Sequence, residues 1–188
     1  MRIITGTARG CRLKTPKGET TRPTADRIKE SLFNILGRRV EEAHVLDLFA
    51  GTGALGLEAL SRGASSALFV DERTASLIEE NAVKARLFDR AEIVRGDALR
   101  VLRRLGTLGR SFDLIFCDPP YRRGLWEKAL SSVDREELLS PDGCMVVEHG
   151  TEEEELPTLE NLHCVREETY GRTTRLRFFS RKVQEVKP

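Results

Sequence analysis

The tetrapeptide Asp118-Pro119-Pro120-Tyr121 combines chemical groups that could act on a planar base. It follows an apolar run, residues 112–117, that is typical of a buried strand. Proline has no backbone N–H and a fixed φ, so two prolines in a row end the strand and stiffen the turn. The turn therefore offers a carboxylate, a rigid carbonyl and an aromatic ring at the carboxyl end of a strand, where open α/β sheets bind ligands.

These groups suit a base that carries an exocyclic amino group, as guanine and adenine do. Such an amine is a poor nucleophile because its lone pair is delocalised into the ring. The Asp118 carboxylate and the Pro119 carbonyl would accept its two N–H bonds, and Tyr121 would stack on the base. We predict that residues 118–121 are catalytic, against the alternative of a stiff loop with an incidental acid. No nucleophilic side chain is needed, so His44, His149 and His163 are interpreted as structural or surface residues.

A glycine-rich loop joins the first predicted strand to the first long helix of the alternating region. Gly51, Gly53 and Gly56 satisfy the pattern G-x-G-x-x-G, in which the backbone turns tightly and approaches a ligand at a helix N-terminus. Glycines at this spacing are also common in ordinary turns. Asp71 ends the next strand, where a carboxylate can hold ribose hydroxyls, with Glu72 as the alternative.

Asp97 follows the third strand and has two possible roles. At the same edge of the sheet it could accept a hydrogen bond from an adenine amino group. It could equally cap the helix that begins at Ala98, because aspartate is a favoured N-cap residue. The sequence leaves both roles open.

The elements that must position these residues alternate along the chain. Predicted strands are residues 45–49, 67–70, 92–95, 112–117 and 144–148, and predicted helices are 55–62, 75–87, 98–105, 125–131 and 135–139. A β-hairpin over residues 2–15 and a helix from the N-cap Thr24 to Leu36 precede them, and a hairpin of residues 164–170 and 174–179 follows. Alternation of this kind predicts an α/β fold: a mostly parallel, Rossmann-like sheet of seven strands, helices on both faces and an antiparallel C-terminal edge.

Length, composition and charge further limit the possible functions. The chain has 188 residues, enough for one well-cored domain. Scattered cysteines argue against a disulfide framework or a zinc site, and the start lacks the apolar core of a signal peptide, so we expect a cytoplasmic protein without a metal. Residues 1–40 carry a charge of +7, residues 163–188 carry +4, and the middle carries −10. Two basic ends indicate either a polyanion-binding surface or solvated tails.

The motifs in this order resemble a class I S-adenosylmethionine-dependent methyltransferase. In that family the glycine turn and first acid hold the methionine part of the cofactor, the second-strand acid the ribose, and the residue after strand three the adenine. The resemblance implies that S-adenosylmethionine binds to Asp47, Phe49, Gly51, Gly53, Asp71, Asp97 and Ala98.

A narrower resemblance covers nearly the whole chain. The segments Arg2-Ile3-Ile4-x-Gly6, Arg9-Gly10-x-x-Leu13 and Arg22-Pro23-Thr24-x-Asp26-Arg27-x-x-Glu30-x-Leu32-Phe33-Asn34 are similar to the RsmD family, bacterial enzymes that methylate a guanine at N2 in small-subunit ribosomal RNA. The similarity implies that the partner is 16S ribosomal RNA within the small subunit or its assembly intermediate. We expect a monomer that does not bind membranes.

Basic residues near the N-terminus and after the catalytic turn could contact this RNA. The predicted RNA-binding residues are Arg9, Arg12, Lys14, Arg22, Arg122 and Arg123. We therefore expect residues 1–40 to be an extension that contacts RNA and closes the cofactor site, residues 41–182 to be the methyltransferase domain, and residues 183–188 to be a tail. Arg22, Thr24, Asp26 and Arg27 could instead pack the N-terminal helix on the glycine loop.

Three other functions compete with this interpretation. An adenine-N6 methyltransferase could use the same turn, but the chain has no room for the usual target-recognition segment. A nicotinamide dehydrogenase would explain the glycines and not the turn at residues 118–121. A non-catalytic RNA-binding assembly factor would not need acids at every cofactor position.

Overall fold

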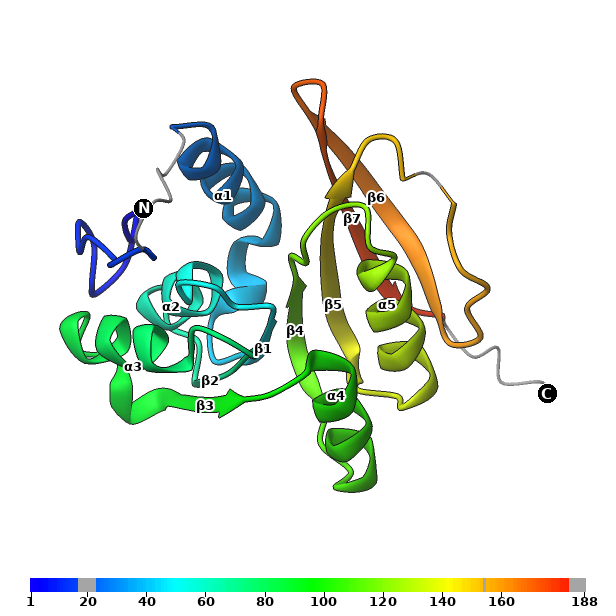
Figure 1. The fold of residues 1–188 in the computed structure, drawn as a ribbon, viewed down its shortest axis with the longest axis horizontal. Coiled ribbons are helices and arrows are strands. Elements are labelled where there is room, and N and C mark those ends of the chain that lie inside the picture. Colours follow the sequence, from blue (N-terminus) through cyan, green and yellow to red (C-terminus); the bar gives the residue numbers. More distant parts are fainter. Residues whose placement is uncertain (17–22, 154, 183–188) are drawn as a thin grey trace.

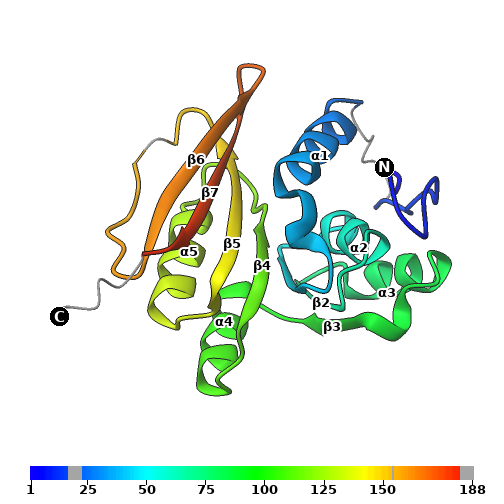
Figure 2. The same cartoon turned by 180° about the vertical axis from the view of Figure 1, so that it is seen from behind.

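The computed structural model describes residues 1–16, 23–153 and 155–182. Within these ranges the chain forms one seven-stranded sheet in the order β3-β2-β1-β4-β5-β7-β6 (Figure 1). The strands are β1 (His44–Leu48), β2 (Ser66–Asp71), β3 (Ala91–Arg95), β4 (Phe112–Cys117), β5 (Leu139–Gly150), β6 (Leu162–Tyr170) and β7 (Thr174–Arg181). The prediction of a mixed sheet with an antiparallel C-terminal edge is confirmed, because β7 pairs antiparallel with both β5 and β6 (Figure 2).

Helices cover both faces of the sheet. The α-helices are α1 (Pro23–Leu36), α2 (Ala54–Ser61), α3 (Ala75–Lys84), α4 (Ala98–Thr107) and α5 (Leu125–Arg135), with short 3₁₀ turns at Gly37–Val40 and Phe88–Arg90. Alternate strand residues point to opposite faces. Val45 and Phe116 therefore join the core formed with α1, α2 and α3, while Leu46 and Ile115 join the core formed with α4 and α5.

Strand order reverses between β1 and β4, which places a crevice at their carboxyl ends. Both strands run parallel, and Leu48 pairs with Cys117. Strand β5 continues the same register on the other side of β4, where Cys117 pairs with Val147. The residues that follow β1 and β4 therefore emerge side by side, next to the last part of β5.

The N-terminal segment packs directly on α2. The predicted hairpin is reduced to a single antiparallel bridge between Arg2 and Arg12. Backbone hydrogen bonds from Ile3 to Cys11, from Gly10 to Ile3 and from Leu13 to Met1 still join its two arms. The N–H groups of Ile4 and Thr5 donate instead to the buried Glu58 carboxylate at 2.7 and 3.0 Å. The segment consequently shares the core of the α2 face and forms no independent sheet.

The helix predicted over residues 75–87 ends at Lys84, and the strand predicted over residues 144–148 extends over Leu139–Gly150. Two further predictions about helices are wrong. Helix α1 begins at Pro23 and not after Thr24, since proline at the first helical position has no donor to lose. The separate helix predicted over residues 135–139 does not form. Helix α5 runs to Arg135, and the positive φ of 50° at Glu137 turns the chain straight into β5. Arg22, the side chain of Thr24 and the predicted tail lie outside what the structure describes.

Gly6 allows the close approach of the N-terminal segment to α2. A Cβ at Gly6 would lie 1.8 Å from the Ser61 carbonyl oxygen, and the φ of this residue is +87°. Gly10 has a similar φ of +83°, but a Cβ there would meet no atom within 4 Å. Gly6 is thus constrained by both backbone conformation and space, whereas Gly10 is constrained by conformation alone.

We predict that Gly6→Ala lowers the free energy of unfolding by about 1–3 kcal/mol more than Gly10→Ala does, because only the former creates a clash. Both variants carry the same left-handed backbone strain. Urea denaturation of the two proteins measures the difference. Equal losses in the two variants would show that the N-terminal segment does not pack tightly on α2.

Candidate functional site

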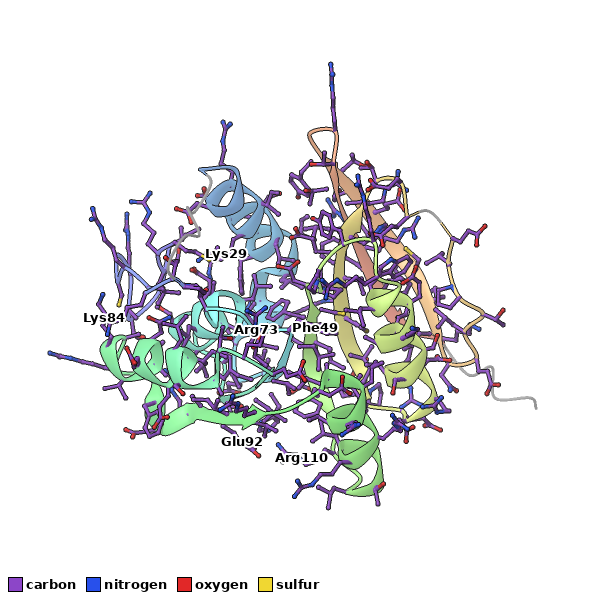
Figure 3. The ribbon with its side chains drawn as sticks, viewed as in Figure 1. Lys29, Phe49, Arg73, Lys84, Glu92 and Arg110 are labelled. Atoms are coloured by element: carbon purple, nitrogen blue, oxygen red, sulfur yellow. The ribbon has the colours of Figure 1, made fainter. Side chains whose placement is uncertain are left out.

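A cavity of about 1030 Å³ opens at the carboxyl ends of β1, β2 and β4. It is larger than the roughly 300–1,000 Å³ of a typical small-ligand pocket, so it has room for a nucleotide-sized cofactor and part of a second molecule. Its lining is Pro16, Phe49, Gly51, Thr52, Val70, Asp71, Glu72, Arg73, Thr74, Gly96, Asp97, Ala98, Asp118, Pro119, Pro120, Tyr121, Arg123, Leu125 and Glu148. Two of these residues, Phe49 and Arg73, are labelled near the middle of the molecule in Figure 3.

The loop after β1 forms one wall of the cavity through an unusual backbone. Phe49, Gly51 and Gly53 all have positive φ, of 58°, 56° and 76°. The left-handed conformation costs a non-glycine residue roughly 1–2 kcal/mol, so Phe49 is held there by its surroundings. One bond that holds the loop runs from the Gly51 N–H to Asp71 Oδ2 at 3.0 Å. Gly51 lines the cavity, and Gly53 starts α2 behind it.

Asp47 lies below this loop and does not line the cavity. Its Oδ2 accepts a hydrogen bond from the Gly56 N–H at 2.8 Å, and it is only 2% exposed. Burial, with a smaller contribution from the charge of Asp71, raises the pKa of Asp47 to about 7 despite that hydrogen bond. A Cβ at Gly56 would lie 2.3 Å from the Phe69 ring, so only glycine fits there. Asp47 therefore supports the glycine loop from beneath.

Asp71 is an ionised acceptor at the end of β2. Burial tends to raise its pKa, but hydrogen bonds outweigh it and the net pKa is below the ordinary value. The Arg73 and Thr74 N–H groups donate to Oδ1 at 2.8 and 2.9 Å, which leaves part of the carboxylate facing the cavity. Glu72 also lines the cavity and is exposed, so both acids considered for a ribose contact are present.

Asp97 caps the helix that follows it. Its Oδ1 accepts a hydrogen bond from the Arg100 N–H at 2.9 Å, which is ordinary N-cap geometry. The same residue is exposed and lines the cavity next to Ala98. The capping role is therefore confirmed, and an additional contact to a ligand remains open to this side chain.

The turn at residues 118–121 forms the opposite wall. Asp118 leaves β4 beside Glu148 of β5, because their preceding residues, Cys117 and Val147, are paired. Deep placement within the protein raises the pKa of Asp118 well above its ordinary value, and the charges of Glu148 and Asp47 raise it further. The residue is nonetheless open to solvent through the cavity.

Tyr121 is anchored by its hydroxyl group. The hydroxyl donates to Glu148 Oε1 at 2.6 Å and lies 3.3 Å from Thr174 Oγ1 on β7. Burial, together with the adjacent charge of Glu148, raises the pKa of Tyr121, so the phenol stays protonated as the donor. The ring is thus fixed at the cavity wall, where it can face a flat ligand.

Glu148 is the site residue that the sequence analysis missed. It lines the cavity and neighbours both Asp118 and Tyr121. The sequence pattern that could have identified it is an acidic residue at the end of an apolar, predicted strand, which is the pattern that identified Asp71. Its partners on β4 could not be inferred without the strand register.

The predicted RNA-binding cations divide into three groups. Arg123 lines the cavity, whereas Arg122 is directed to Glu152 at 2.8 Å. Arg9, Arg12 and Lys14 are exposed on the N-terminal segment, and Pro16 of that segment reaches the cavity lining. The side chain of Lys14 donates to Glu80 at 2.6 Å. Arg22 falls outside the described residues.

Other features of the described residues do not compete with this cavity. A smaller hollow of about 370 Å³ lies between α4 and α5 and contains no residue from a strand end. Across residues 1–16, 23–153 and 155–182, no three His, Cys, Asp or Glu side chains are grouped as metal ligands would be. None of the helices in the same ranges is long and apolar enough to span a membrane.

Comparison with known proteins identifies close relatives. A family model described as conserved hypothetical protein 95 matches residues 1–179. The putative rRNA methyltransferase YlbH of Bacillus subtilis (strain 168) is 40% identical over 92% of this chain and 95% of its own. Ribosomal RNA small subunit methyltransferase D of Escherichia coli (strain K12) is 36% identical over 98% of this chain and 91% of its own.

Solved structures agree in fold. The putative methyltransferase yhhF from Escherichia coli superimposes with a TM-score of 0.85 at 35% identity, covering 98% of this chain and 99% of that one. SMU.776, a putative methyltransferase complexed with SAH, has a TM-score of 0.66 at 16% identity, over 85% of this chain and 50% of that one. The second similarity supports the fold alone.

The raised pKa of Asp47 predicts a pH-dependent stability. A carboxyl with a pKa near 4 when unfolded and about 7 when folded stabilises the folded state in its protonated form. That contribution is complete below about pH 4 and is lost as the pH rises through 7. In the Asp47→Asn variant, the side-chain oxygen can still accept the Gly56 N–H, but the side chain no longer titrates. Relative to this variant, we expect the wild type to lose on the order of 4 kcal/mol of unfolding free energy over that window.

Denaturant unfolding of both proteins from pH 4 to pH 9 measures this difference, in which the titration of all other groups cancels. A difference that is independent of pH would mean that Asp47 is ionised in the folded protein like an ordinary surface carboxylate.

Proposed function

We propose, since the chain belongs to the RsmD family of small-subunit ribosomal RNA methyltransferases, that it transfers a methyl group from S-adenosylmethionine to the exocyclic N2 amino group of a guanine in 16S ribosomal RNA. Family membership supports the methyltransferase activity on ribosomal RNA. The observation that carries the assignment to an amino group is the cavity wall made by Asp118, Pro119 and Tyr121.

The cavity fits S-adenosylmethionine at the end nearer β1, β2 and β3. Asp71 keeps a lowered pKa, so it can accept hydrogen bonds from ribose hydroxyls. Asp97 and Ala98 border the place for the adenine ring, and Phe49 and Gly51 border the place for the methionine part. When bound, the cofactor supplies a methyl group activated by a sulfonium. Asp47 and Gly53 act on this site indirectly, by holding the glycine loop.

The turn at the end of β4 orients the amine. The Asp118 carboxylate and the Pro119 carbonyl accept the two N–H groups of N2, which favours a pyramidal nitrogen with an available lone pair. Pro120 stiffens the turn, and Tyr121 fixes the plane of the base. Such alignment is worth roughly 7–11 kcal/mol of barrier at best, so no covalent intermediate is required.

RNA reaches this site across the basic N-terminal segment. Arg123 lines the cavity, and the exposed Arg9, Arg12 and Lys14 lie on the segment that ends near Pro16 at its rim. Residues 1–40 thus combine a phosphate-binding surface with one side of the cofactor site, and residues 41–182 supply the catalytic domain. The target base must leave its stack, which costs a few kcal/mol and less in a loop than in a duplex.

We predict that Asp118→Ala lowers kcat by at least about 10³-fold while binding of S-adenosylhomocysteine stays nearly unchanged, because the acceptor contacts the base and not the cofactor. Tritium transfer to small subunits from a deletion strain gives the rate, and calorimetry gives the binding constant. Mass spectrometry of the nucleosides identifies the product. Wild-type turnover by the variant would show that Asp118 is not catalytic. N6-methyladenosine as the product would show that the target base is adenine and not guanine.

We predict that reversing the charges of Arg9, Arg12 and Lys14 to Glu raises the KM for small subunits at least about 10-fold and flattens its dependence on salt, because fewer phosphate contacts release fewer counterions. The matched control reverses Arg103, Arg104 and Arg110, which lie on the last part of α4 and before β4, away from the cavity lining. Equal effects of the two triple variants would exclude a specific RNA contact by the N-terminal segment.

A further inference from the structure

Two carboxylates stand side by side where β4 ends next to β5. Strands β4 and β5 lie side by side (Figure 2). Phe116 pairs with Val146 and Cys117 with Val147 in parallel register, so Asp118, directly after β4, stands next to Glu148 of β5. Side chains at equivalent positions of neighbouring strands point to the same face. Both residues accordingly line the same cavity.

The two oxygens of Glu148 have different surroundings. Oε1 accepts the hydrogen bond from the Tyr121 hydroxyl at 2.6 Å. No described residue donates a hydrogen bond to Oε2, and Glu148 is half-buried at the cavity wall. Burial raises the pKa of Glu148, and the hydrogen bond donated by Tyr121 opposes that shift. The same hydrogen bond fixes which oxygen of Glu148 remains for a ligand.

Guanine presents two kinds of donor on one edge, the N2 amino group and the adjacent N1–H. In the proposed reaction, Asp118 and the Pro119 carbonyl accept the N2 protons, which leaves N1–H in need of an acceptor as the base enters a partly dry site. Adenine differs at this point, since the N1 next to its amino group is itself an acceptor. A carboxylate facing that position would bind guanine and disfavour adenine.

We propose that Glu148 is the residue that determines base specificity: its free Oε2 accepts the N1–H of the target guanine. This inference rests on the proposed function and adds the basis on which guanine is distinguished from adenine. It also gives strand β7 a role in the site, because Thr174 and Glu148 together hold the Tyr121 hydroxyl.

Glu148→Gln is an informative variant because its amide has one acceptor and one donor group. Tyr121 holds the oxygen, so the NH₂ group replaces Oε2 and faces N1 of the base. A donor there opposes the N1–H of guanine and matches the N1 of 2-aminopurine, which keeps the 2-amino group and has no N1–H. The substitution preserves size, so a loss of folding does not obscure the result.

The experiment starts with the guanine that the wild type methylates in small subunits from a deletion strain. Subunits are then reconstituted with guanine or 2-aminopurine at that nucleotide, and kcat/KM is measured for wild type, Glu148→Gln and Tyr121→Phe. We expect Glu148→Gln to lower kcat/KM on guanine by about 10- to 100-fold, the range for a hydrogen bond to a charged group. On 2-aminopurine its kcat/KM should equal or exceed that of the wild type.

Tyr121→Phe is the matched control, because it removes the anchor and keeps the Glu148 carboxylate. It should slow both substrates while retaining the wild-type preference for guanine. Equal losses on both bases in Glu148→Gln, or a wild type that does not distinguish the bases, would overturn the assignment of Glu148 and leave the proposed function intact. A wild type that methylates no guanine at N2 would overturn both.

Discussion

The parallel pairing of β1, β4 and β5 is the constraint on which the site depends. Leu48 pairs with Cys117 and Cys117 with Val147, so Phe49 and Asp118, directly after β1 and β4, stand level with Glu148 of β5. A slip of one residue would turn each of these side chains to the opposite face. The cofactor loop and the base-binding turn are thus positioned by the hydrophobic core that fixes the register, on both faces of the sheet.

Two fully buried carboxylates hold the loops around that sheet. Asp47 binds the start of α2 through Gly56, and Glu58 of the same helix joins the N-terminal segment to α1 and α2 through Lys29 and Arg62 at 3.2 and 2.8 Å. Buried charges are costly unless they are paired or protonated. Their partners here are backbone N–H groups, Lys29 of α1 and Arg62 at the end of α2, so each carboxylate specifies one arrangement of the loops.

Much of this arrangement could be predicted from the sequence, because it depends on local patterns. Apolar runs ending in Asp71 and Asp118 gave the strand ends, and the double proline gave the turn. What the sequence could not supply were contacts between distant segments. The role of Glu148 depends on its neighbour Asp118 at the end of β4, and the support given by Asp47 depends on Gly56. In the N-terminal hairpin, the N–H groups of Ile4 and Thr5 bind Glu58 of α2. Sequence spacing contains no information on such partners.

A crystal structure of the protein with S-adenosylhomocysteine and a guanine nucleoside would test the central claim most directly. The account predicts that the cofactor lies between the Phe49 loop and Asp71, with its sulfur facing the Asp118 carboxylate across a space that the base amine occupies. A cofactor bound elsewhere, or an Asp118 side chain turned away from the amine, would contradict it.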